Sequence, residues 1–216
     1  MASVRTPNWA WTTLASDEQI ERTAAALETN GMRAIVVDTG DEARHQVFAL
    51  LPAGAQVLTM TSRTLETIEV AEGINEPSDI VESRRYVALR PRLMQMNRET
   101  QWPEMRRMGA SPDSAVGSVH AVTEQGEVFV ASASGSQLAA YVFGAGSVIW
   151  VVGSQKIVPD REAAFKRIYE YSFPREDERA REAYGIGSGV NKVLIVNREF
   201  TPGRITVILV KQELGF

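Results

Sequence analysis

The stretch of residues 116–159 constrains the fold more than any other part of the chain. It contains two apolar runs, 128–131 and 148–152, whose length and β-branched residues are typical of buried strands. Between them, a turn of small residues at 134–137 opens a short helical segment at 138–142. Strand, turn, helix and strand in this order predict a βαβ unit, and such units bind ligands at the carboxyl ends of their strands.

The rest of the chain alternates between helix and strand patterns. Ser16 and Gln19 have the spacing of a capping box ahead of a helix, and Asp160 is expected to cap another helix that stops before Pro174. These patterns predict a single α/β domain over residues 1–216, a mostly parallel sheet with helices on both faces. Further strands are expected at 33–38, 56–60, 118–122, 192–197 and 204–211, and further helices at 41–51, after residue 61 and at 175–183.

An arginine-rich segment interrupts this alternation. Residues 76–112 are predicted to form a helical insertion outside the sheet, made of one or two helices that are interrupted at Pro91 and Pro103. Its arginines fall within residues 84–107. A solvated, charged helical surface is the simplest interpretation of such a run, and the alternatives are a lid over an anionic ligand or a contact with a partner subunit. The oligomeric state is left open.

Composition excludes several classes of function. Acidic residues outnumber basic ones by 27 to 23, for a net charge of −4, so we expect neither nucleic acid nor an anionic membrane as a partner. Without any cysteine, the chain has no disulfide, thiol nucleophile or thiolate-held cluster. Only His45 and His120 remain as imidazole ligands, so no metal and no cofactor is expected. No signal peptide or run of roughly 18 apolar residues is found, which predicts a soluble cytoplasmic protein.

The first candidate site is the turn that follows the strand at 56–60. It contains Thr61, Ser62, Arg63 and Thr64 at the expected start of a helix. Hydroxyl groups and free backbone N–H groups at a helix start suit a phosphate or carboxylate, and an arginine adds a charge-assisted contact. The alternative is an ordinary helix N-cap, for which Ser and Thr are common.

The second candidate site is the turn made by Ser134, Gly135, Ser136 and Gln137. Glycine lets the backbone approach a ligand closely and the serines add donors, so the turn is a candidate anion cradle; a plain tight turn is the alternative. It matches neither the Walker loop nor the GxGxxG fingerprint. If both turns belong to one sheet, they are expected to face one pocket.

Three single residues complete the candidates. Glu124 lies in an expected turn between strands, where a carboxylate is suited to act as nucleophile or general base, although such turns often expose Glu for structural reasons. His120 lies within an expected strand and is either catalytic or an ordinary core or surface residue. Lys156 follows the strand at 148–152, where its ammonium is either within reach of an anion or simply solvated.

Three segments together resemble a known family. Residues 118–158, the segment TSRTLE at 61–66 and the C-terminal segment at 202–216 resemble the LUD domain proteins, the lactate utilisation proteins related to the smallest subunit of the bacterial LutABC system. The resemblance implies a fold like that of the NagB/RpiA/CoA-transferase superfamily. It also implies a link to lactate oxidation alongside iron–sulfur partner subunits.

What the resemblance implies for individual residues is narrower. In the wider superfamily, small-residue loops at strand ends hold sugar phosphates or CoA thioesters, so the turns at 61–64 and 134–137 would be the equivalents, and Glu124 would correspond to an acyl-accepting glutamate. Many relatives carry a cysteine-rich segment near residues 184–191, which this chain lacks, so a redox role of the chain itself is in doubt.

Two functions are therefore expected. The first is an accessory component of lactate or organic-acid utilisation that binds a small anionic metabolite. The alternative is an enzyme that acts on a sugar phosphate or CoA ester through Glu124 or His120 together with Lys156.

Overall fold

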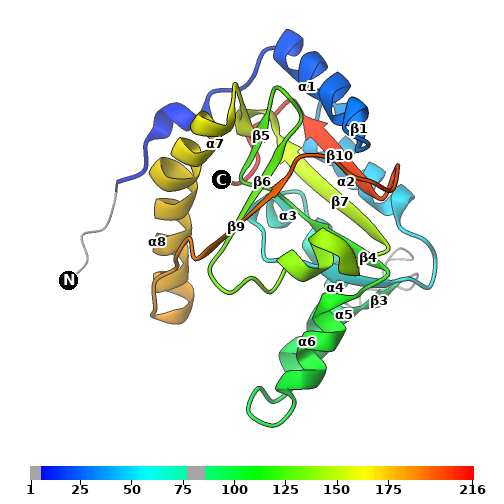
Figure 1. Ribbon diagram of the computed structural model, residues 1–216. Helices are drawn as coiled ribbons and strands as arrows, with labels where there is room; N and C mark the ends of the chain where they lie inside the picture. The colour runs from blue at the N-terminus through cyan, green and yellow to red at the C-terminus, as the bar shows by residue number, and fades with distance from the viewer. Residues whose placement is uncertain (1–5, 77–85) are drawn as a thin grey trace.

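The computed structural model describes residues 6–76 and 86–216 and has an α/β architecture built on a parallel sheet (Figure 1). All neighbouring strands of this main sheet are parallel, which confirms the predicted fold class. In spatial order its six strands are β1 (Arg33–Val37), β10 (Ile205–Val210), β7 (Ser147–Gly153), β4 (Ser114–Gly117), β2 (Gln56–Thr59) and β3 (Val87–Ala88).

A second, smaller sheet was not predicted from the sequence. In it β6 pairs antiparallel with both β5 and β9, while β5 and β8 are parallel. Its four strands, in spatial order, are β8 (Ile157–Val158), β5 (Ala121–Thr123), β6 (Val128–Ser132) and β9 (Lys192–Val196).

Helices surround both sheets. The α-helices are α1 (Asp17–Thr29), α2 (Gly40–Leu50), α3 (Arg63–Thr67), α4 (Val70–Asn75), α5 (Leu89–Gln95), α6 (Trp102–Ala110), α7 (Arg161–Arg167) and α8 (Phe173–Tyr184). Shorter 3₁₀ or π segments are η1 (Trp9–Thr12), η3 (Ala140–Gly144), η4 (Ser154–Lys156) and η5 (Ile168–Ser172). In Figure 1, α6 projects away from the body of the molecule at the bottom of the view.

The side chains of β7 show how the layers pack. Val148 and Trp150 point to one face, where they join a core with α1 and the small sheet, whereas Ile149 and Val151 point to the other face, toward α2, α3 and α4. A third cluster, which includes Phe129, lies between the small sheet and α7. The main sheet is therefore covered on both faces, as predicted, but the small sheet and α1 together form one of the two covers.

Several local signals are confirmed. Ser16 and Gln19 form a capping box at the start of α1, Ser62 caps α3, and Asp160 caps α7 through the N–H group of Ala163.

The predicted βαβ unit is wrong. Its first strand, β6, belongs to the small mixed sheet, and its second strand, β7, belongs to the main parallel sheet. The helical segment between them exists, ending in η3, but it connects two sheets instead of crossing over one. Consequently the turns at 61–64 and 134–137 follow strands of different sheets, and the expectation that one sheet carries both is also wrong.

The proline positions were also misjudged. Pro91 and Pro103 lie in the first turns of α5 and α6, where a backbone N–H has no intrahelical acceptor, so both helices tolerate them. Pro174 does not end the helix either, because α7, η5 and α8 follow one another without interruption. The carbonyl of Glu170, four residues before Pro174, accepts a hydrogen bond from the Asn8 N–H at 2.8 Å instead.

The arginine-rich segment is only partly outside the sheet. Its helices α5 and α6 lie beyond the main sheet, but Val87 and Ala88 form the edge strand β3, which pairs with β2. Residues 77–85, with Arg84 and Arg85, lie outside the described residues.

Candidate functional site

Three polar side chains follow three adjacent strands of the main sheet. Thr64 lies in α3, after β2; Ser118 comes directly after β4; and Lys156 lies in η4, directly after β7. These strands are neighbours in the order β7, β4, β2 and are parallel, so their carboxyl ends meet at one edge of the sheet. This edge is where open α/β sheets bind ligands.

Lys156 joins the other two residues. Its Nζ donates to Thr64 Oγ1 at 2.9 Å and to Ser118 Oγ at 3.0 Å, and only 1% of its surface is exposed. Burial, and then the charge of Arg167, hold the pKa of Lys156 well below its usual value of 10.5. Lys156 therefore lies buried at the carboxyl edge, so the alternative of a solvated lysine is wrong, while its contact with an anion stays a prediction.

Arg167 is the second cation of this region, and the sequence interpretation missed it. It is the last residue of α7 and is fully buried. Its Nε donates to the carbonyl of Gln155 at 3.2 Å, and its Nη1 donates to Ser172 Oγ at 3.0 Å and to the carbonyl of His120. Arg167 is thus bonded to the backbone beside Lys156 and close to Ser118.

Nη2 of the Arg167 guanidinium makes no hydrogen bond within the described residues. This nitrogen is buried, and none of the ion pairs within residues 6–76 and 86–216 includes Arg167. Burial lowers the pKa of Arg167 to about 10, opposed by Tyr171 and Glu213, so the side chain still carries its charge at neutral pH. The result is a buried positive charge whose remaining donors are free.

His120 adds a neutral imidazole. It lies between β4 and β5 rather than within a strand, so that expectation is wrong. Its Nδ1 accepts a hydrogen bond from the Ala131 N–H at 3.1 Å, which leaves the proton of the neutral ring on Nε2. Burial, then the charges of Lys156 and Arg167, lower the pKa of His120 from 6.5 to about 3, although part of the residue's surface remains exposed. We call Thr64, Ser118, His120, Lys156 and Arg167 the cationic cluster.

The other residues of the first predicted turn have structural contacts. Thr61 accepts a hydrogen bond from Arg90 at 2.8 Å, and Ser62 caps α3. Arg63 forms an exposed ion pair with Glu66 at 2.9 Å. Only Thr64 of this turn belongs to the cationic cluster.

The second predicted turn is closed by its own hydrogen bonds. Ser134 Oγ accepts from the Ser136 N–H at 3.2 Å, and Ser132 Oγ accepts from the Gly135 N–H at 2.8 Å and donates to Gln137 Oε1 at 3.0 Å. Gly135 has a φ of 84°, which favours glycine. Within the described chain, no hydrogen bond joins this turn directly to the cationic cluster. The side-chain amide of Gln137 donates to the carbonyl of Ala131 at 3.4 Å, and Ala131 in turn is bonded to His120.

Glu124 ties the hairpin between β5 and β6 to α1. Its carboxylate accepts from Gln19 Nε2 at 2.8 Å and pairs with Arg22 at 2.8 Å. The hydrogen bonds from Gln19 and Arg22 lower the pKa of Glu124 against a smaller opposing effect of burial. Both carboxylate oxygens are therefore engaged by α1, away from the cationic cluster.

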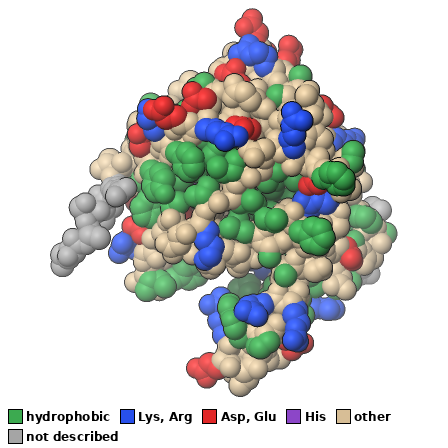
Figure 2. Space-filling view, viewed as in Figure 1, with side chains coloured by type: hydrophobic (Ala, Val, Ile, Leu, Met, Phe, Trp, Pro, Cys, Tyr) green, Lys and Arg blue, Asp and Glu red, His purple; other side chains and the backbone are tan. Residues whose placement is uncertain are grey.

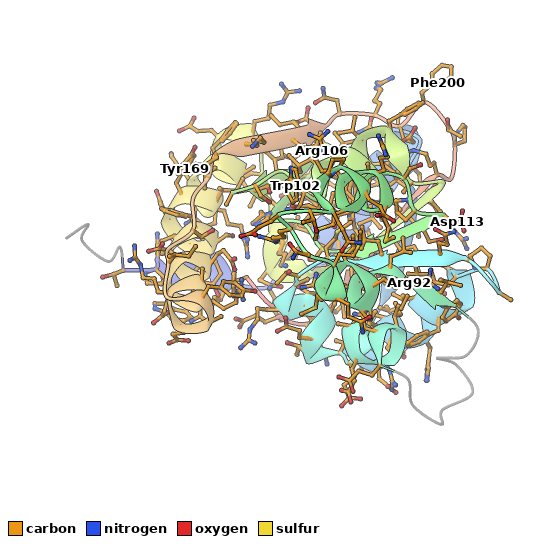
Figure 3. All side chains as sticks on the ribbon, turned by 90° about the horizontal axis from the view of Figure 1, so that it is seen from below. Arg92, Trp102, Arg106, Asp113, Tyr169 and Phe200 are labelled. Carbon is orange, nitrogen blue, oxygen red and sulfur yellow. The ribbon has the colours of Figure 1, made fainter. Side chains whose placement is uncertain are left out.

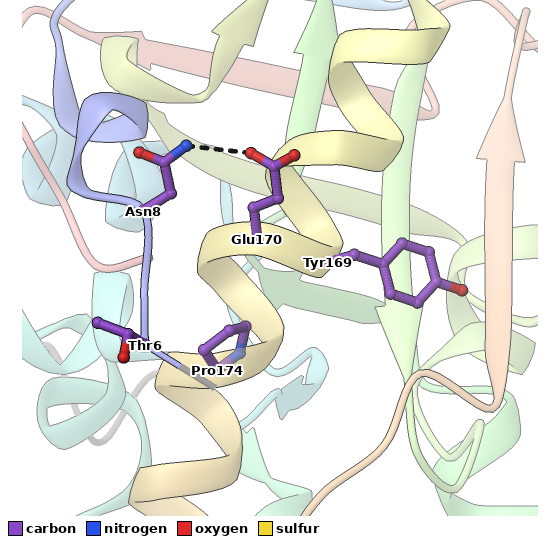
Figure 4. A pocket seen from close by; sticks show the side chains of 5 residues that line it. All are labelled: Thr6, Asn8, Tyr169, Glu170 and Pro174. Carbon is purple, nitrogen blue, oxygen red and sulfur yellow. Dashed lines mark hydrogen bonds between the residues drawn. The ribbon is translucent and has the colours of Figure 1, made fainter. Parts of the chain in front are cut away.

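A surface pocket away from the cationic cluster is lined by residues of the N-terminal segment and of the helix formed by η5 and α8. These residues are Thr6, Asn8, Tyr169, Glu170 and Pro174 (Figure 4). Glu170 accepts hydrogen bonds from Asn8 at 3.1 Å and from the indole N–H of Trp11 at 2.9 Å. These bonds anchor the N-terminal segment.

Neither a metal-binding cluster nor a membrane-spanning helix is found within residues 6–76 and 86–216. No group of three or more His, Cys, Asp or Glu residues there is arranged to hold a metal ion. No helix in the same part of the chain is long and apolar enough to cross a membrane.

The fold and the site together define an α/β protein with a six-stranded parallel sheet whose carboxyl edge carries a buried lysine and a buried arginine. The family model described as the LUD domain matches residues 20–210, so the chain belongs to the LUD domain family, and the resemblance seen in the sequence is confirmed. No curated protein matches the sequence.

Two solved structures resemble this chain to different extents. A DUF162 family protein from Deinococcus radiodurans is 14% identical, with a TM-score of 0.55 over 92% of this chain and 99% of that chain, which shows a shared fold. The eIF2B beta subunit from Chaetomium thermophilum is 17% identical, with a TM-score of 0.36 over 57% of this chain and 44% of that chain.

Proposed function

We propose that this LUD domain protein binds a small organic anion at the cationic cluster and serves as an accessory component of lactate or organic-acid utilisation. The observation that carries the proposal is the buried Arg167, which keeps its charge and has free Nη2 donors within the described chain. Glu213 acts on Arg167 electrostatically, but no carboxylate of the described chain is hydrogen-bonded to the guanidinium. A bound carboxylate would therefore offset the cost of burying this charge through charge-assisted hydrogen bonds.

The neighbouring groups support an anion as the ligand. Lys156, Ser118 and Thr64 add polar atoms at the same sheet edge, and no carboxylate of the described chain forms an ion pair with Lys156 or Arg167. The free donors on Nη2 of a single guanidinium match one carboxylate, so the proposed ligand is a short acid. Lactate, pyruvate and similar short acids fit this description.

A thermal-shift screen of the purified chain tests the proposal. Lactate, pyruvate, sugar phosphates and CoA esters are added separately, and a ligand at about 100 times its dissociation constant stabilises the folded state by about 2.7 kcal/mol. Arg167→Met is expected to abolish the stabilisation. The matched control is Arg161→Met on the same helix, because Arg161 is exposed and pairs with Glu127. If no anion stabilises the wild-type protein, or if Arg167→Met responds as the wild type does, the proposal is wrong.

An accessory role also needs a surface for a partner, such as an iron–sulfur subunit. The proposed surface is the α5–α6 projection, formed by α5 and α6, whose exposed side chains include Arg92, Trp102, Arg106 and Arg107. Figure 2 shows basic side chains gathered on this lower part of the molecule, and Figure 3 shows Arg92, Trp102 and Arg106 from below. Arg and Trp are enriched in protein interfaces. Because interfaces pair opposite charges, we expect the partner to present an acidic surface to these arginines.

Charge reversal tests the partner surface. Arg106→Glu with Arg107→Glu is expected to abolish co-purification with the partner subunit, whereas Arg198→Glu, an exposed arginine on the segment after β9, leaves it unchanged. Unchanged association in the double variant removes this part of the proposal.

The alternative function is an enzyme acting on a sugar phosphate or CoA ester through Glu124 or His120. Glu124→Gln or His120→Asn would then abolish turnover. The engagement of Glu124 by Gln19 and Arg22 favours a structural role for that residue. Turnover that survives both substitutions would remove the alternative.

A further inference from the structure

The hydrogen bonds around Lys156 determine how many protons its nitrogen can donate. Thr64 Oγ1 donates its only proton to the carbonyl of Leu214 at 3.0 Å, and Ser118 Oγ donates its only proton to the carbonyl of Val151 at 2.7 Å. Both hydroxyl oxygens must therefore accept from Lys156 Nζ, at 2.9 and 3.0 Å. Lys156 Nζ is therefore the donor in both hydrogen bonds.

This arrangement fits a neutral amine better than an ammonium group. A neutral amine has two N–H donors and one lone pair, whereas an ammonium group has three donors. The two donors of a neutral Lys156 are both used by Thr64 and Ser118, and within residues 6–76 and 86–216 no third acceptor and no carboxylate contacts Nζ. The lone pair of the neutral amine is then directed away from both hydroxyls and is free.

The charged and titratable groups around Lys156 favour the same state. Arg167, at the end of α7, places a positive charge nearby, and His120, ahead of β5, is itself neutral in the folded protein. Burial and the charge of Arg167 both lower the pKa of Lys156. A desolvated lysine beside another cation is a recognised way to obtain an amine nucleophile at neutral pH.

We propose that Lys156 is a catalytic residue that forms an imine with a small carbonyl compound carrying an anionic group, such as a 2-oxo acid. The inference rests on the proposed function, because Arg167 binds the anionic group while Lys156 meets the carbonyl carbon. Ser118 is partly exposed and Thr64 is buried, so the compound approaches from the side of Ser118.

The reaction balances without an oxidant or reductant. The lone pair of Nζ attacks the carbonyl carbon and forms the C–N bond, while the π electrons of the C=O bond move to the oxygen. The nitrogen then loses both of its protons, the oxygen leaves with them as water, and a C=N bond remains. The substrate atoms other than the oxygen stay attached to Lys156.

The first test measures the protonation of Lys156 in the wild-type protein. The chain has four lysines, Lys156, Lys166, Lys192 and Lys211, so ¹³C-lysine labelling gives few side-chain Cε signals to follow by NMR against pH. Lys166 and Lys211 are exposed or half-buried and paired with carboxylates, which makes them internal controls. We expect Lys156 to be neutral at pH 7 and the controls to be charged. A charged Lys156 at pH 7 overturns the proposal.

The second test traps the imine. The wild-type protein is incubated at pH 7 with pyruvate and cyanoborohydride, whose hydride reduces the C=N bond, and peptide mapping locates the adduct. Because only about one in a thousand ordinary lysine side chains is neutral at pH 7, the adduct at Lys156 is expected to exceed that at the other lysines by at least about tenfold. Lactate, which has the carboxylate but no carbonyl, should compete with pyruvate and form no adduct.

The outcomes separate this inference from the proposed function. If lactate stabilises the protein but no adduct forms at Lys156, anion binding stands and the imine is overturned. If an adduct forms at Lys156 but no anion stabilises the protein, the imine stands and the anion-binding proposal fails. Lys156→Met removes the amine, so trapping in this variant is expected to fall to the level of the other three lysines; trapping that stays at the wild-type level would overturn the imine.

Discussion

His120 should make the stability of the protein depend on pH in a way that one substitution removes. Its imidazole is neutral in the folded state, with Nδ1 accepting from the Ala131 N–H at 3.1 Å and with Lys156 and Arg167 nearby. His120→Asn keeps an acceptor oxygen close to the position of Nδ1 but cannot be protonated. The substitution therefore removes the titration while it retains the hydrogen bond.

The sign and size of the effect follow from the two pKa values. The pKa of His120 falls from 6.5 in the unfolded chain to about 3 in the folded protein, so between these values the unfolded state binds more protons. The stabilisation is complete above pH 6.5 and is lost as the pH falls toward 3. At 1.36 kcal/mol per pH unit, the wild type should lose about 2 kcal/mol between pH 7.5 and pH 5 through this residue alone.

Urea unfolding of both proteins at pH 7.5 and pH 5 measures this loss. The difference between the two pH values should be about 2 kcal/mol larger for the wild type than for His120→Asn. The matched control is His45→Asn, because His45 is the other histidine and is exposed on α2. An equal pH dependence in the wild type and His120→Asn would refute the reasoning, as would an NMR titration in which His120 is protonated near pH 6.5.

Two further substitutions test the packing beside the site and the start of α1. In Gly117→Ala, the new Cβ would lie 1.8 Å from the Tyr141 hydroxyl oxygen, so urea unfolding should show a loss of about 1–3 kcal/mol. Adding Tyr141→Phe should recover much of the lost free energy of unfolding, because it removes the hydroxyl that clashes. Gly109→Ala in α6 serves as the control, since its new Cβ would have no neighbour closer than 4.0 Å. An equal loss with and without the tyrosine hydroxyl would contradict the clash. Ser16→Ala should lower the free energy of unfolding by about 1 kcal/mol through loss of the α1 cap, whereas Ser16→Asn, which can still cap, should not; equal losses would exclude capping as the cause.

The parts of the fold that local patterns determine were predictable. The capping box at Ser16, the N-cap at Asp160 and the apolar strands β7 and β10 depend on residues a few positions apart, and each is present. Sheet membership depends on pairing between distant segments. The run in β6 is as apolar as a strand of the main sheet, and its pairings with β5 and with β9, some sixty residues later, place it in the small sheet.

The same limit applies to the prolines. Pro174 was expected to end a helix because its ring removes a backbone hydrogen bond and clashes with the preceding turn. In the structure, η5 widens that turn, and the N-terminal Asn8 supplies the N–H that the Glu170 carbonyl would otherwise lack. A contact between residues 8 and 170 has no signature in the sequence near either of them.

The candidate site shows where sequence reasoning ended and where it had more to offer. Lys156 and Thr64 were found because both follow strands, and a parallel sheet brings the ends of its strands together.

Arg167 was overlooked because it stands among charged residues of α7. Its spacing was informative nevertheless: Ala163, Ala164 and Ile168 are apolar and share one face of the helix, and a residue at position 167 lies on that face. An arginine on a buried helix face needs acceptors or an anion, and its hydrogen-bond partners in the described chain use only Nε and Nη1. The donors that remain on Nη2 are the reason to look for an anionic ligand at this edge of the sheet.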